Sequence, residues 1–208
     1  ALLAEISRVI YPDREVTIPR IERKSQPQSK ATAYSPPMKK LVDEHLLIKR
    51  LLAMVPGIIE ELDLSTEPGR QVISQSVDFI RSYADKFHHA KEEDILFKCF
   101  DENLDIIKTI CADHENGRAL VREALAALER QDRETVISNL GAYTALLTEH
   151  IKKEDEILYR WMDRNLTMTQ IGELFSRFSE KDKEFAGTPE KYQEFIAQLE
   201  KKIIPRRK

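Results

Sequence analysis

Two ten-residue segments of the chain, separated by about sixty residues, carry the same side chains in the same order. HHAKEEDILF begins at His88, and HIKKEDEILY begins at His150. In each segment a glutamate follows the first histidine four residues later, Glu92 in one and Glu154 in the other. Residues four apart lie on one face of a helix, so each segment presents an imidazole beside a carboxylate. Imidazole with carboxylate is a ligand set for iron, manganese or zinc.

Both histidine–glutamate pairs fall within apolar stripes of their predicted helices. An ionised carboxylate in an apolar interior is very costly unless it is paired or coordinated. Two divalent cations bridged by the two carboxylates offset that cost, and such a site needs the same half-site twice. The apolar neighbours are Val77, Ile80, Ala84 and Ile95 in the first stripe, and Tyr143, Leu147, Ile157, Leu158 and Trp161 in the second.

The remaining histidines extend this pattern to all four predicted helices. The chain has five histidines, and His45 and His114 also lie on apolar stripes. His89 aligns instead with polar residues, so we expect it to face solvent; a pair of His89 with Glu93 is the alternative register. The predicted metal ligands are His45, His88, Glu92, His114, His150 and Glu154.

Four long helical segments must position these ligands. We expect them over residues 37–63, 66–98, 103–130 and 132–165, with Asp132 as an N-cap. Short connections make neighbouring helices antiparallel, which predicts an all-α, up-down-up-down four-helix bundle over residues 37–165. Residues 1–36 are expected to form an N-terminal arm or linker. Residues 166–208 are expected to form a C-terminal extension with helices near 167–184 and 188–203.

The overall composition restricts the partners. The chain has 208 residues, 33% of them charged, and a formal net charge of −3. This balance indicates neither nucleic acid nor an anionic membrane surface as a partner, and no apolar run approaches the roughly 18 residues needed to span a bilayer. The start of the chain lacks the pattern of a signal peptide, and Cys99 and Cys111 are expected to be reduced thiols. We therefore expect a cytoplasmic protein, with the oligomeric state left open.

Over about residues 38–165 the chain resembles the hemerythrin-like (HHE cation-binding) family. Four segments carry the resemblance: DEHLLI around His45, HHAKEEDILF, ADHENGR around His114, and EHIKKEDEILY. Ferritin-like di-iron bundles instead use Glu-x-x-His, in which the two ligands are three positions apart. The reverse order and the spacing of four in this chain separate it from that class.

The resemblance implies a centre of two non-haem iron ions with oxo or hydroxo and carboxylate bridges, although other divalent metals remain possible. It implies terminal imidazole ligands, two for each iron: His45 with His88, and His114 with His150. The implied bridges are Glu92 and Glu154.

Two places differ from the oxygen-carrying members of that family. Those proteins have a fifth histidine where this chain has Arg118, which leaves a place open to water, Glu115 or a substrate. They also use His-x-x-x-x-Asp on the last helix, so Asp155 competes with Glu154, and the internal repeat favours Glu154. The resemblance therefore implies binding or sensing of O₂, NO or peroxide, or iron handling. The alternative is an enzyme with oxidase, peroxidase or NO-reducing activity at the same centre.

Overall fold

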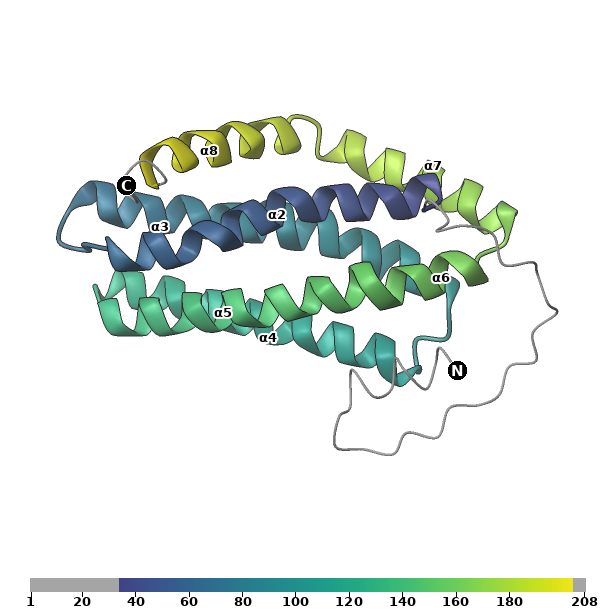
Figure 1. Ribbon diagram of the computed structural model, residues 1–208, viewed down its shortest axis with the longest axis horizontal. Helices are drawn as coiled ribbons and strands as arrows, with labels where there is room; N and C mark the ends of the chain where they lie inside the picture. The colour runs from purple at the N-terminus through teal and green to yellow at the C-terminus, as the bar shows by residue number, and fades with distance from the viewer. Residues whose placement is uncertain (1–33, 204–208) are drawn as a thin grey trace.

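The computed structural model describes residues 34–203, and these form helices and turns with no strand. Four helical rods build an antiparallel bundle, and two further helices lie along one side of it (Figure 1). This confirms the predicted all-α bundle with additional C-terminal helices. Most of the predicted N-terminal arm lies outside the described residues, and the division of the chain into three parts stays a prediction.

The four rods and the two extra helices have the following bounds. The first rod is α2 (Pro36–Glu60). The second consists of α3 (Glu67–Phe79), η1 (Ile80–His89), η2 (Glu92–Leu96) and η3 (Phe97–Cys99). The third is α4 (Asp105–Glu129), and the fourth consists of α5 (Arg133–Lys153), η4 (Glu154–Leu158) and α6 (Tyr159–Asn165). The extra helices are α7 (Met168–Glu184) and α8 (Thr188–Ile203). Within residues 34–203, none of the helices combines the length and the apolar character needed to cross a bilayer.

Side-chain caps fix where several helices begin. Asp132 accepts a hydrogen bond from the backbone N–H of Thr135, which confirms it as the N-cap of α5. Thr66 caps α3 in the same way, and Thr167 forms a capping box with Gln170 at the start of α7. Such caps satisfy backbone N–H groups that have no partner within the helix. They therefore set how far along each rod the histidines lie.

The two repeated segments depart from α-helical geometry at the same point. Helix η2 begins at Glu92 and η4 begins at Glu154, and both are π-helical over five residues. The longer η1 is also π-helical and ends at His89. A π-helical turn holds more residues than an α-helical turn, so it rotates the side chains that follow, and such turns are frequent at functional sites. The repeat in sequence is thus also a repeat in backbone geometry.

The apolar core is divided into two clusters. One lies toward the α3–α8 end of the bundle and includes Ile48, Ile73, Val77 and Leu140. The other lies toward the opposite end and includes Met38, Leu96, Tyr159 and Phe178. Most of the buried polar side chains within residues 34–203 come from the middle of the rods, between these clusters. The core is therefore two apolar bodies with a polar layer between them.

The two extra helices are part of this packing. Helices α7 and α8 lie along α2 and the second rod, on the side away from α4 and α5 (Figure 1). Helix α7 buries Leu174 and Phe178 in one cluster, whereas α8 buries Tyr192, Ile196 and Leu199 in the other. They thus cover both apolar bodies from outside.

The α7 contact can be tested with two phenylalanines on the same helix. Phe178 is 0% exposed and Phe175 is 53% exposed. We expect Phe178→Ala to lower the free energy of unfolding by about 3–5 kcal/mol, because it leaves a cavity in the core. Phe175→Ala should change it by less than about 0.5 kcal/mol. Urea denaturation measures both, and equal effects would show that α7 does not pack as described.

Candidate metal centre

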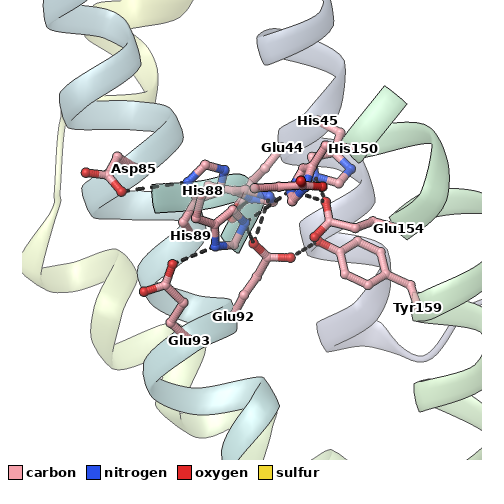
Figure 2. Close-up of polar contacts among 12 residues, drawn as sticks. Glu44, His45, Asp85, His88, His89, Glu92, Glu93, His150, Glu154 and Tyr159 are labelled. Atoms are coloured by element: carbon pink, nitrogen blue, oxygen red, sulfur yellow. Dashed lines mark hydrogen bonds and ion pairs between the residues drawn. The ribbon is translucent and has the colours of Figure 1, made fainter. Parts of the chain in front are cut away.

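The polar layer contains every histidine of the chain and two glutamates. These seven side chains come from all four rods, and Figure 2 shows six of them, all but His114, pointing toward one another. All of them are buried. They are His45, His88, His89, Glu92, His114, His150 and Glu154. The structure thus brings together the six ligands predicted from the sequence, and adds His89.

Each glutamate lies between two imidazoles from different rods. The Oε2 atom of Glu154 is 3.4 Å from Nε2 of His45 and 3.2 Å from Nε2 of His150. The Oε2 atom of Glu92 is 3.9 Å from Nε2 of His88 and 3.5 Å from Nε2 of His114. Both carboxylates therefore have the position that a ligand shared between two cations requires.

The potential ligand atoms form overlapping groups, in each of which the atoms lie within 4.8 Å of one another. The groups are His45 with His88 and Glu154, His89 with His114 and His150, and Glu92 with His114 and Glu154. Since Glu154 and His114 each belong to two groups, the layer offers adjoining places for cations.

Several inner atoms of the layer have no hydrogen-bond partner among the described residues. They include Nε2 of His45, Nε2 of His88, Oε2 of Glu92 and both carboxylate oxygens of Glu154. Leaving a buried polar atom without a partner is costly, and such atoms are rare in folded proteins. Imidazole nitrogens and carboxylate oxygens are ligands of first-row transition metals, so a bound metal would satisfy these atoms. The donor set therefore fits the metal centre that the sequence predicts.

The expectation that His89 faces solvent is wrong. His89 is only 6% exposed, and its ring stacks on that of His114 with 3.9 Å between ring centroids. The cause is the π-helical geometry of η1, in which the angle between successive residues is smaller than in an α-helix. Two consecutive histidines, His88 and His89, can then both turn inward. The layer consequently contains five imidazoles.

Each of the five imidazoles also faces a carboxylate with its outer nitrogen, Nδ1. The pairs and their N···O distances are His45–Asp155 at 2.7 Å, His88–Glu44 at 2.9 Å, His114–Glu93 at 2.5 Å, His150–Asp113 at 3.4 Å and His89–Asp85 at 3.7 Å. A carboxylate in this position orients the ring and leaves Nε2 free to bind a metal. Asp155 and Glu93, which the sequence left as candidate ligands, thus lie behind histidines.

The outer carboxylates are in turn paired with cations. Arg118, at the place of the fifth histidine of oxygen carriers, points toward these acids. Its Nε lies 2.8 Å from Asp85, and its Nη2 lies 2.8 Å from Glu93. Glu115 is 67% exposed and also pairs with Arg118, so neither residue belongs to the inner group. Histidine, carboxylate and cation therefore form successive shells around the layer.

These shells repeat with the same sequence spacing in both halves of the chain. The acid that precedes a histidine on one rod contacts the histidine of the following rod, as in Glu44–His88 and Asp113–His150. The acid after each inner glutamate contacts a histidine of another rod, as in Glu93–His114 and Asp155–His45. A cation four residues after a histidine contacts the acid that faces this histidine. Lys49, which follows His45, contacts Asp155, and Arg118, which follows His114, contacts Glu93. Arg118 is thus the counterpart of Lys49.

The sequence interpretation missed Lys91 and its partners. Lys91 is fully buried, and it contacts Glu44, the acid behind His88. It also lies 2.8 Å from Asp182 on α7 and 3.4 Å from the centre of the Phe87 ring. Burial raises the pKa of Glu44 to about 7, although Lys91 opposes that shift. The sequence repeat could have indicated the role of Lys91. Lys153 occupies the equivalent position in the second segment and lies 3.5 Å from Asp113, the acid behind His150.

Tyr159 also has a polar contact that its apolar neighbours concealed. It is fully buried, but its hydroxyl donates a hydrogen bond to Oε1 of Glu92. Its ring stacks on His45 with 5.5 Å between centroids. The equivalent residue of the first repeat is Phe97, which has no hydroxyl. The phenol therefore belongs to only one of the two halves.

The two inner glutamates differ in acidity. Burial raises the pKa of the Glu92 carboxyl well above its usual range, and the nearby Glu154 carboxylate raises it further. Burial acts on Glu154 in the same direction, but His150 and His45 outweigh it and hold the pKa of that carboxyl well below its usual range. Without a cation, Glu92 thus holds a proton more strongly than Glu154 does. A metal that binds Glu92 competes with that proton.

The sequence matches the family model of the hemerythrin HHE cation binding domain over residues 37–162. This range covers nearly all of the four rods and every inner residue described above, and it is more than half of the chain. The chain therefore belongs to the hemerythrin HHE cation-binding family.

Its curated relatives include uncharacterized proteins of Mycobacterium bovis and of two strains of Mycobacterium tuberculosis. Each is 21% identical over 151 residues, which cover 68% of this chain and 59% of the relative. The chain thus spans less than two thirds of the length of these relatives. No solved structure matches the sequence significantly.

The position of His89 gives a test of the inner group. We expect His89→Gln and His88→Gln each to reduce the metal bound per chain at least twofold, because each removes an imidazole from the layer. Glu115→Gln, on the exposed surface of α4, should leave it unchanged. Elemental analysis of the purified variants measures this. Full metal content in His89→Gln, with loss in His88→Gln, would exclude His89 from the ligands.

Two lysines paired with outer carboxylates allow a matched test of burial. We expect Lys91→Met to lower the free energy of unfolding by about 3–5 kcal/mol, since it leaves the buried Glu44 without its cation. Lys49 is 47% exposed, so Lys49→Met should cost less than about 1 kcal/mol. Both are measured by urea denaturation at constant metal content. A similar loss in the two variants would contradict the importance of burial at Lys91.

Proposed function

We propose that this protein binds two non-haem iron ions in its polar layer, and that the centre binds or senses O₂, NO or peroxide, or stores iron. The observation that supports this most directly is the position of Glu92 and Glu154, each between imidazoles of two different rods. Two adjacent irons, when bound, supply exchangeable coordination places and one-electron chemistry for such ligands. Membership of a cation-binding family supports the same proposal.

In this proposal the two irons have different histidines. His45 and His88 hold one, and His114 and His150 hold the other, with His89 on the side of the second pair. Glu92 and Glu154 are shared between them. The outer carboxylates keep each ring in place, and the two apolar clusters exclude bulk water from the layer. The protein's own contribution is thus a rigid and dry set of ligands.

A catalytic role is the second candidate, and Tyr159 is the observation that favours it. Its hydroxyl donates to Glu92 inside the layer, where it can hold or deliver a proton beside a bound ligand. An oxidase, a peroxidase or an NO-reducing enzyme needs such a proton, whereas reversible binding of O₂ does not.

The proposal also places the protein in the cytoplasm, in keeping with Cys99 and Cys111, which form no disulfide.

Metal content and optical spectra test the centre itself. We expect two irons per chain and near-ultraviolet charge-transfer bands typical of oxo-bridged ferric pairs. Mixing the reduced protein with O₂, NO and peroxide in a stopped-flow instrument then separates the roles. Stable adducts indicate a binding or sensing protein, whereas repeated consumption of one reagent indicates an enzyme. Zinc alone, with no spectral response to any of the three, would contradict the proposal.

Removal of the metal should destabilise the fold. A metal that binds only the folded state adds about 2.7 kcal/mol when its free concentration is a hundred times the dissociation constant. For a domain of this size we expect chelation to lower the melting temperature by roughly 5–10 °C. The control is a His45→Ala/His150→Ala variant, in which the same chelator should have no effect. An unchanged melting temperature in the wild type, after confirmed loss of metal, would refute the stabilising role.

A further inference from the structure

A pocket of about 430 Å³ opens beside the polar layer, between the second rod and α4. His89 and His114 form part of its wall at the metal-centre end, and Tyr143 and Leu147 of α5 line it from a third rod. Its volume falls within the range of about 300–1,000 Å³ found for small-molecule sites. A water molecule occupies only about 30 Å³ in the liquid. The pocket is thus far larger than O₂, NO or peroxide requires.

Much of the pocket wall is apolar. The apolar lining residues, from three rods, are Ile80, Val121, Leu125, Ala126 and Leu147. Gly117 adds to the space, because a Cβ atom there would lie 3.5 Å from the Tyr143 ring. A glycine at this point of α4 leaves a recess that a larger side chain would fill. The wall therefore suits an apolar chain or ring.

One polar group of this wall has no partner. The hydroxyl of Tyr143 is buried and makes no hydrogen bond within the described part of the chain. Burial raises the pKa of this phenol, so it is a neutral hydrogen-bond donor at physiological pH.

The mouth of the pocket is positively charged. Arg81, Lys86 and Arg122 line it, are exposed, and have no ion-pair partner among residues 34–203. Three acids also line the pocket, so its lining, with Arg118 included, has a net charge of +1. Asp113 has a cation beside it in Lys153, whereas Asp85 shares Arg118 with Glu93 and Glu115. Three free cations at the edge of an apolar pocket favour an anionic group.

We propose that this pocket binds a small organic anion with an apolar body, of the class of medium-chain carboxylates. The apolar body lies against Val121, Leu125 and Leu147, and the carboxylate lies at the rim near Arg81 and Arg122. The inference rests on the proposed function in one respect: a molecule held there lies against His89 and His114, next to the di-iron centre. It names the class of substrate or effector that the centre would meet.

Calorimetric titration of the full, iron-loaded chain tests the binding, with decanoate as the probe. We expect one decanoate per chain. Decyltrimethylammonium has the same chain and the opposite charge, and acetate has the charge without the chain. Each should bind at least tenfold more weakly than decanoate. Failure of decanoate to bind, or equal binding of the cationic compound, would overturn the inference.

Variants locate the site. Arg81→Glu/Arg122→Glu should weaken decanoate binding at least tenfold. Lys108→Glu/Lys152→Glu is the matched control, because it changes the net charge equally at exposed positions outside the pocket. It should leave the affinity within twofold. Equal affinities in the rim variant and its control would overturn the inference.

Iron content, measured on the same samples, separates this inference from the proposed function. Samples with two irons that do not bind decanoate would refute only the pocket assignment. Samples that bind decanoate at the rim but never take up iron would refute the di-iron centre, and the organic-anion site would stand by itself.

Discussion

The burial of seven ionisable side chains in one layer is the constraint on which the rest of this structure depends. Each imidazole and carboxylate there loses contact with water, and several of the inner atoms have no hydrogen-bond partner within residues 34–203. Such burial is tolerated only if other charges compensate for it. The outer acids, the cations behind them and the inward-facing pairs of ligand atoms all follow from this requirement. The surrounding apolar clusters then hold the shells in place.

Much of the fold and of the inner group could be predicted from the sequence. The apolar stripes gave the four rods because they extend over many turns, and Asp132 marked a helix start by a local hydrogen bond. Glu92 and Glu154 were predicted because residues four apart share a helix face, and because the segment occurs twice. The prediction for His89 failed because a periodicity of 3.6 residues does not hold through a π-helical segment.

The outer shell could not be predicted in the same way, because its contacts join different rods. Glu44 precedes His45 in the sequence but contacts His88, and Asp155 follows Glu154 but contacts His45. A single sequence shows which residues are neighbours along a helix, but not which helix faces which acid. The repeated order of acid, histidine and cation was nevertheless present in both halves. This order predicts the contacts of the outer shell once the antiparallel arrangement of the rods is known.

The differences between the two halves have a consequence for how the centre fills. The repeat provides His89 and Asp85 in the first half, whereas the equivalent residues in the second half are Ile151 and Leu147. It provides a phenol only through Tyr159. One place in the layer thus has three imidazoles around it, and the other has two imidazoles and the carboxylate of Glu154. In the di-iron centre proposed above, the first ion to bind would occupy the side with three imidazoles, and the second would complete the other side.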